Sequence, residues 1–206
     1  MMDPGTPAEE EARRDPLPAE VADWIAESER QRDELRVLVD AHSTDALRWR
    51  PQPGGWSIAE HIRHLVLTNE EYIDALEESL GQTAAEGFAG HPPYASSFFG
   101  SRFLRSLEPP VERRFKTFKR LNPPSEPGSP DEVLAAFDAG MDRYEALLRS
   151  NARVDMGRAR MRSPFLWLLK LTLAEAAQVV LAHNRRHLWL ADEVIRSPGF
   201  PAAGSG

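Results

Sequence analysis

The sequence predicts an all-α fold, a four-helix bundle in which a long crossover link joins the second and third helices. Four segments carry apolar residues at the spacing of an amphipathic helix. Three of them open with a Ser/Thr-x-x-Glu capping box, whose side chains satisfy backbone N–H groups at the helix start. A proline-rich stretch, which cannot continue a helix, separates the two middle segments. A chain of 206 residues fits one such domain more comfortably than two.

The first helix is expected from about Pro18 to His42, because proline is favoured in the first turn and an apolar stripe follows it. The second is expected to start at Ser57 and to run towards Leu80. Ser57 and Glu60 form its capping box, which defines where this helix begins.

The third helix is expected to start at Ser129, where the capping box with Glu132 is combined with a proline at the first helical position. The fourth is expected to begin near Thr172, whose capping partner is Glu175, and to continue to about Ile195. Both segments carry apolar residues at helical spacing, so both are expected to bury one face.

The link from about Gly81 to Gly128 is unusually long for a compact bundle. Such a link indicates a crossover between helices that point the same way, or a lid over a functional site. A short helix near Ser97–Ser106 fits inside it, whereas residues 151–170 are expected to form a second, irregular link. The long link also carries a basic cluster, which is either a solvated loop that balances an acidic body or an anion site beside a pocket: Arg102, Arg105, Arg113, Arg114, Lys116, Lys119 and Arg120.

The predicted bundle spans residues 17–197. Residues 1–16 are polar, acidic and proline-containing, a composition that buries too little apolar surface to fold. We therefore expect a disordered N-terminal tail there, and a flexible C-terminal tail over residues 198–206.

The composition excludes several classes of function. The formal net charge of −7 argues against a general nucleic-acid binder, which needs a basic surface. The N-terminus shows no apolar signal segment, and no apolar run approaches the roughly 20 residues of a membrane-spanning helix. We expect a cytoplasmic protein that binds neither nucleic acid nor membrane. The chain has no cysteine, so any thiol chemistry would need a thiol from outside.

Two histidines of the fourth helix point to a metal. His183 and His187 are four residues apart, so they lie one turn apart on the same helix face, within reach of one ion. They also lie within the apolar arc of that helix, where a neutral imidazole needs a partner for its polar nitrogens. A metal is one such partner, and a pair of hydrogen-bonded core histidines is the alternative.

The second helix offers two candidates for a third ligand, His61 and His64. Helical periodicity places His61 nearer the apolar face and His64 further round. On periodicity alone His61 is the better candidate.

Two sequence motifs indicate a known protein family. Residues 54–65 read GGWSIAEHIRHL and residues 183–188 read HNRRHL. In this order and on this helix layout they resemble the DinB-like (YfiT-like) metalloenzyme superfamily. In that family Gly-x-Trp-Ser/Thr precedes the second helix, and a histidine followed by an apolar residue lies eight positions after the tryptophan. Here the tryptophan is Trp56, and the eighth residue after it is His64. The resemblance covers roughly residues 20–196.

The resemblance implies a four-helix bundle with an unusual crossover topology and a metal held by His64, His183 and His187. The implied cofactor is a divalent transition metal, zinc or nickel first, with iron, manganese and copper also compatible. Some members are thiol S-transferases that use thiols such as bacillithiol or mycothiol, and one branch is a thiol-dependent isomerase. Many relatives carry glutamine three residues after the last histidine, where this chain has Leu190.

Two classes of function follow. The first is a metal-dependent enzyme that acts on a small-molecule substrate, with a low-molecular-weight thiol as cosubstrate. The second is a non-catalytic bundle that works through association, with metal structural or absent. A homodimer fits either class, because the apolar stretch around Trp167 needs cover. No catalytic residue beyond the metal ligands, and no organic cofactor, is assigned.

Overall fold

The computed structural model describes residues 16–111, 118–124 and 127–201. Nearly all of the predicted N-terminal tail and most of the predicted C-terminal tail therefore lie outside the described residues. So do Arg113, Arg114 and Lys116 of the basic cluster. Within residues 198–206, Phe200 is described, and its ring packs edge-on against His42 and Trp49.

The chain is an all-α four-helix bundle, as predicted. The long helices are α2 (Ala19–Asp40), α4 (Ile58–Ala85), α6 (Pro130–Ser150) and α7 (Leu173–Ile195). Shorter ones are α3 (Thr44–Arg48), α5 (Phe98–Leu107) and the 3-10 turn η1 (Lys119–Leu121). In the described part of the chain, no helix is both long and apolar enough to cross a membrane.

All three predicted capping boxes form. At the start of α4 the Ser57 hydroxyl accepts from the Glu60 amide at 3.2 Å, and the Glu60 carboxylate accepts from the Ser57 amide at 2.9 Å. Ser129 and Thr172 make the same pair of bonds with the third residue of α6 and α7. These helix starts were predictable because a capping box is a local signal that needs no tertiary partner.

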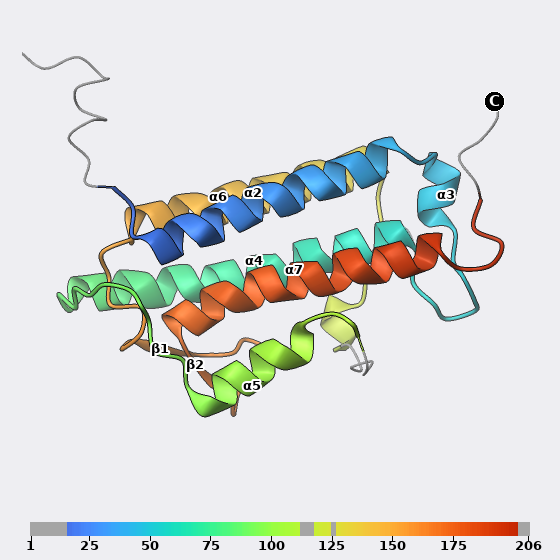
Figure 1. Cartoon of the computed structure of the whole chain (residues 1–206). Coiled ribbons are helices and arrows are strands. Elements are labelled where there is room, and N and C mark those ends of the chain that lie inside the picture. Colours follow the sequence, from blue (N-terminus) through green and yellow to red (C-terminus); the bar gives the residue numbers. More distant parts are fainter. Residues whose placement is uncertain (1–15, 112–117, 125–126, 202–206) are drawn as a thin grey trace, which may run out of the picture.

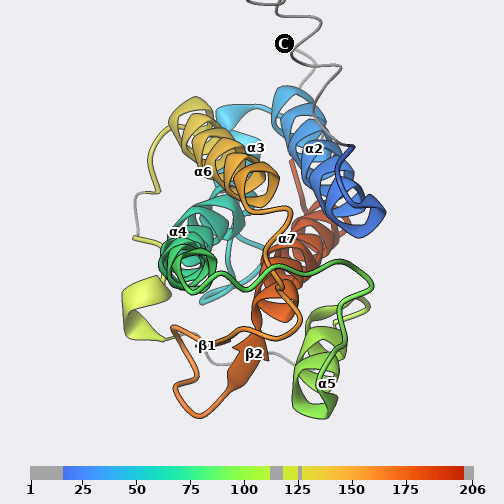
Figure 2. The same cartoon turned by 90° about the vertical axis from the view of Figure 1, so that its left-hand side faces the viewer.

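The four helices form two layers, α2 with α6 and α4 with α7 (Figures 1 and 2). The colour progression in Figure 1 shows that α4 and α6 run in the same direction. The chain must therefore return along the bundle between them, and the described residues between 86 and 129 do so (Figure 1). This confirms the predicted crossover.

The two links build a third layer beneath α4 and α7 (Figure 2). In it α5 packs against α7, and η1 packs against α4. The sequence predicts an irregular link over residues 151–170, but part of this link forms regular structure. Strand β1 (Arg160–Arg162) pairs antiparallel with β2 (Lys170–Thr172). Three-residue strands are too short for an alternating pattern to stand out in the sequence.

A chain of buried amides connects three of the helices. Gln31 of α2 donates to the Leu181 carbonyl of α7 at 3.0 Å, and Asn184 of α7 donates to the Gln31 side-chain oxygen at 3.0 Å. Asn69 of α4 donates to the Asn184 side-chain oxygen at 3.0 Å. All three amide side chains are buried. A buried amide that loses its partner costs about 1–3 kcal/mol, so this chain favours one register of α2, α4 and α7.

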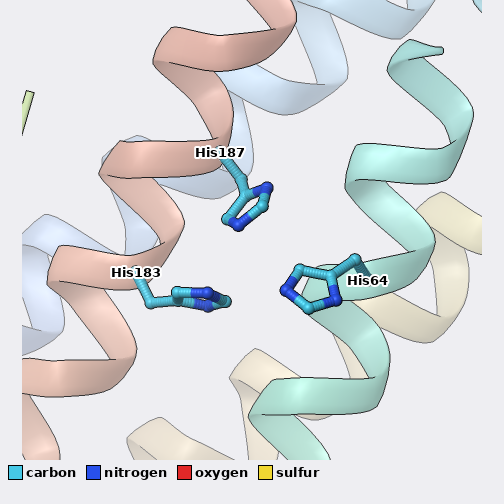
Figure 3. Close-up of side chains that lie close together, drawn as sticks. All are labelled: His64, His183 and His187. Atoms are coloured by element: carbon cyan, nitrogen blue, oxygen red, sulfur yellow. The ribbon is translucent and has the colours of Figure 1, made fainter. Parts of the chain in front are cut away.

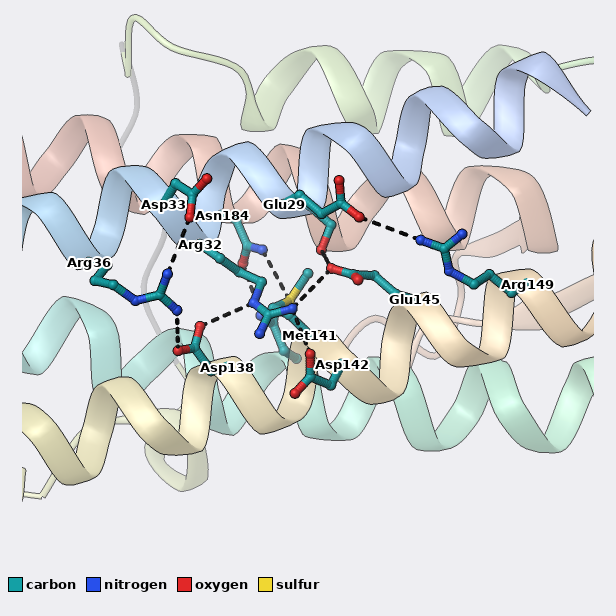
Figure 4. Close-up of polar contacts among 12 residues, drawn as sticks. Glu29, Arg32, Asp33, Arg36, Asp138, Met141, Asp142, Glu145, Arg149 and Asn184 are labelled. Carbon is teal, nitrogen blue, oxygen red and sulfur yellow. Dashed lines mark hydrogen bonds and ion pairs between the residues drawn. The ribbon is translucent and has the colours of Figure 1, made fainter. Parts of the chain in front are cut away.

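Ion pairs join α2 to α6 along their outer edge (Figure 4). Arg32 contacts Asp138 at 3.1 Å and Asp142 at 2.6 Å, and Arg36 contacts Asp138 at 2.9 Å. Beneath them the Ser28 hydroxyl donates to the buried Glu145 carboxylate at 2.7 Å. The α2–α6 layer is thus held together by ion pairs at its outer edge and by buried contacts beneath them.

One carboxylate anchors both α7 and α5. Glu175, fully buried, accepts from the Thr172 amide at 2.8 Å in the capping box of α7. It also accepts from the backbone amide of Ser97 and, at 3.2 Å, from the Ser97 hydroxyl at the start of α5. The approach is close because residue 100 is glycine, and a β-carbon there would overlap the Glu175 carboxylate.

We therefore expect Gly100→Ala to lower the free energy of unfolding by about 1–3 kcal/mol, because overpacking displaces α5 or the buried carboxylate. The matched control is Gly140→Ala in α6, where the added methyl group meets no heavy atom within 4 Å. That change should raise stability by up to about 1 kcal/mol, the difference in helix propensity. Urea unfolding of both variants measures this, and equal effects would contradict the anchoring role of Glu175.

Candidate metal centre

Three histidines from two helices meet on the face of the α4–α7 layer that is covered by the third layer. His64 comes from α4 and His183 and His187 come from α7, and their rings point towards one another (Figure 3). One nitrogen from each ring lies within 4.8 Å of the other two. The ring centroids are 5.2 Å apart for His64 and His183, and 4.6 Å apart for the other two pairs. We call these residues the three-histidine cluster.

Hydrogen bonds engage the Nδ1 atom of each ring. His64 Nδ1 lies 2.8 Å from the Leu121 carbonyl oxygen, which can only accept, so His64 carries its proton on Nδ1. The Thr68 hydroxyl donates to the His64 carbonyl at 2.9 Å, which leaves its oxygen to accept from His183 Nδ1 at 3.3 Å. His187 Nδ1 lies 2.9 Å from His61 Nδ1. Nε2 is therefore the nitrogen that each ring has left for a ligand.

The donor set suits a divalent transition metal. Metal-bound histidines usually donate their second ring N–H to a carbonyl, carboxylate or water, as His64 does here. Nitrogens on one tetrahedral zinc lie about 3.3 Å apart, because each Zn–N bond is about 2.0 Å. Because the nitrogens of the three rings lie within 4.8 Å of one another, binding one zinc ion would shorten each N–N distance by no more than about 1.5 Å.

The cluster is neutral at neutral pH. Burial lowers the pKa of His64 below its ordinary value of 6.5, although the hydrogen bond to Leu121 opposes this shift. Burial lowers the pKa of His183 and His187 well below 6.5, and the positive charges of neighbouring histidines and of Arg186 lower it further. Neutral imidazoles keep a lone pair for a metal, so little proton release would oppose binding.

The cluster lines a cavity of about 740 Å³. The cavity lies between the α4–α7 layer and the third layer, and its walls are mostly apolar. They include Trp56, Phe103, Leu121, Phe165 and Leu190. The glutamine that many relatives carry is therefore replaced by an apolar wall residue.

Polar side chains continue from the cluster along one face of α4. Thr68 and Tyr72 follow His64 at one and two turns, and both line the cavity. The Tyr72 hydroxyl lies 2.9 Å from the Ser163 hydroxyl, and burial raises the Tyr72 pKa to about 12. The phenol therefore stays protonated at neutral pH. Asn69, also on α4, lies instead in the buried amide chain.

The fourth histidine, His61, is buried like His64 and His187, as helical periodicity predicts, whereas His183 is half-buried. Its ring is not one of the three whose nitrogens converge, and it contacts His187 from the side. Trp56 lies against this group, with its ring centroid 5.3 Å from that of His61 and 4.9 Å from that of His64.

The other charged residues near the cluster have structural partners. Glu60 caps α4 and pairs with Arg50, with N–O distances of 2.5 and 2.8 Å. Arg185 pairs with Glu108 and Glu27 on neighbouring elements. Arg186 donates to the Ser106 carbonyl in the last turn of α5 at 3.3 Å.

Two partners of the cluster were not identified from the sequence. Thr68 lies one turn after His64, so its place on the same face was readable from the spacing. The Leu121 carbonyl belongs to the crossover link, more than fifty residues from His64, and a backbone oxygen has no sequence signal.

The fold and the site together define a class of protein: four-helix bundles with a crossover between parallel helices and three convergent histidines at a cavity. Comparisons with known proteins agree with this class. The chain belongs to the DinB superfamily, whose family model matches residues 27–191. The fold is similar to that of YfiT from Bacillus subtilis, described as a probable metal-dependent hydrolase with an unusual four-helix bundle topology. The TM-score is 0.60 at 19% sequence identity, over 92% of this chain and 93% of YfiT. No curated protein matches the sequence. The predicted family is confirmed.

The lowered histidine pKa values predict that the metal-free protein loses stability in mild acid. The unfolded chain takes up protons near pH 6.5, where the folded cluster does not. The contribution to stability is therefore complete above pH 6.5 and is lost as pH falls. Each histidine adds a slope of up to about 1.4 kcal/mol per pH unit.

Urea unfolding of the metal-free protein between about pH 7 and pH 5 measures this slope. His187→Gln should show a smaller slope than the wild type. The difference isolates the histidine, since the carboxylates titrate in both proteins. Parallel curves would contradict the neutral, buried state of His187.

Proposed function

We propose that the chain is a metal-dependent enzyme in which His64, His183 and His187 hold one divalent transition metal ion. The observation that carries the proposal is the position of the three-histidine cluster in the wall of a large, mostly apolar cavity. A purely structural metal site is closed by four protein ligands, whereas three ligands leave a position for a reactant. Here that position faces a space large enough for a small molecule.

Three imidazoles suit zinc, nickel, copper or iron, so the ligands favour no single metal among these. Zinc or nickel is proposed first. An ion held by these residues would act as a Lewis acid and lower the pKa of a nucleophile at its open position.

The proposed reaction forms a bond between the sulfur of a low-molecular-weight thiol and a carbon of a small electrophile, and it releases the thiol proton and the leaving group of the electrophile. The chain has no cysteine, so the thiol must enter as a cosubstrate. The aromatic walls formed by Trp56, Phe103 and Phe165 suit an apolar electrophile and keep water away from it. Hydrolysis is the second candidate reaction. It is supported by the description of YfiT, and it needs only that water take the place of the thiol.

A non-catalytic role through association, with a homodimer as its simplest form, has its own support. Four large apolar side chains on α5 and on the turn between β1 and β2 are between 70% and 77% exposed: Phe98, Phe99, Trp167 and Leu168. Exposed apolar side chains in such number are typical of contact surfaces. The cavity and its histidines favour the enzyme, because association alone requires neither.

Metal content tests the proposal. Protein purified without a histidine tag should contain about one metal ion per chain by elemental analysis. His64→Ala and His187→Ala should lose the ion, because two imidazoles bind far more weakly than three. His42→Ala is the matched control, since His42 bonds the Leu38 carbonyl at the C-terminal end of α2 and does not line the cavity. No metal in the wild type, even after reconstitution, would favour the association role.

A second assay separates the two reactions. Metal-loaded protein is mixed with a bimane electrophile or a nitrophenyl ester, with and without a low-molecular-weight thiol. Thiol transfer predicts a thioether product that depends on both metal and thiol. Ester cleavage without thiol would favour hydrolysis, and no metal-dependent product from any pair would argue against the enzyme.

A further inference from the structure

The hydrogen bond between His61 and His187 differs in kind from the other two bonds that hold the cluster. His61 lies on α4 one turn before His64, and its Nδ1 atom is 2.9 Å from Nδ1 of His187. Both side chains are buried, at 8% and 6% exposure, so the bond is shielded from water. A bond between two imidazole nitrogens needs one proton, which either ring can supply.

His64 and His183 leave no such choice. The Leu121 carbonyl can only accept, and the Thr68 hydroxyl already donates to a backbone carbonyl. Both rings therefore carry the proton on Nδ1 and present the Nε2 lone pair. For His187, the direction of its hydrogen bond with His61 decides which ring nitrogen carries the proton. If His61 donates, neutral His187 carries its proton on Nε2 and cannot bind a metal through that nitrogen.

We propose that His61 is the positioning residue of the metal centre: its Nδ1 accepts the proton of His187 Nδ1 and so presents the Nε2 lone pair of His187 to the ion. The proton of neutral His61 then sits on Nε2. This role rests on the metal site proposed above, whereas the hydrogen bond itself does not.

The surroundings of His61 suit a fixed acceptor. The Trp56 ring lies nearly edge-on to the imidazole, at an interplanar angle of 67° and a centroid distance of 5.3 Å. The His61 and His187 rings are inclined by 50°, with centroids 5.2 Å apart. His61 also lines the cavity. The helical periodicity that points to His61 is thereby explained: the residue faces inward because it contacts His187.

Nitrogen NMR of the imidazole rings tests the bond directly. We expect a scalar coupling across the hydrogen bond between the two Nδ1 atoms. In zinc-loaded protein His187 should be protonated on Nδ1 and His61 on Nε2. A reversed proton assignment, with His61 protonated on Nδ1 in the zinc-loaded protein, would overturn the proposal.

Two variants test the role. His61→Leu removes the acceptor and leaves the buried His187 Nδ1–H without this partner, so zinc affinity should fall about 10- to 100-fold. His61→Asn keeps an acceptor near the position of Nδ1 and should restore most of the affinity and the Nδ1–H form of His187. His42→Leu, the matched control, should leave zinc affinity unchanged.

Each remaining outcome is decisive. Unchanged affinity in His61→Leu would mean that His61 does not position His187. Complete loss of zinc in both His61→Leu and His61→Asn, as in His64→Ala, would mean that His61 is itself a ligand. A wild type that binds no zinc would overturn the metal site and the role together, and the coupling would then show whether a purely structural bond remains.

Discussion

The register of α7 against α4 is constrained by the buried amide chain, and the candidate site depends on that register. Asn184 accepts from Asn69 across the α4–α7 interface and donates to Gln31 on α2. A shift of one residue along α7 would rotate its side chains by about 100° and leave these buried amides without their hydrogen-bond partners. It would also turn His183, the neighbour of Asn184, away from Thr68 and His64. The same bonds that specify the bundle thus bring the three histidines together.

The crossover link serves both topology and chemistry. Because α4 and α6 run in the same direction, the chain must return along the bundle. The returning segment lies over the histidines, supplies the Leu121 carbonyl to His64 and walls the cavity with α5. The buried Glu175 carboxylate fixes one end of α5 and Arg186 contacts the other, so that wall is attached at both ends to the helix that carries two of the histidines.

The chemistry of the cluster follows from its burial. Imidazoles in an apolar wall stay neutral, and each finds a partner on Nδ1, so the group is ordered before any ion arrives. Preorganised neutral ligands favour binding because neither protons nor water must be displaced from them first. The cavity wall is mostly apolar, and the exposed Phe98 and Phe99 of α5 are not part of it.

The sequence by itself determined the parts that depend on local interactions. Capping boxes and helical spacing defined the four long helices, the length of the link implied the crossover, and the four-residue spacing placed His183 and His187 on one face. The choice between His61 and His64 was different. They lie only about 60° apart around α4 and both face inward; periodicity favoured His61 as the ligand, whereas the family motif favoured His64. The position of α7 decided that His64 joins the cluster and His61 contacts His187. The β1–β2 hairpin, the Leu121 carbonyl and the cavity likewise came only from the tertiary structure, because each depends on residues far apart in the chain or on backbone atoms that every residue shares.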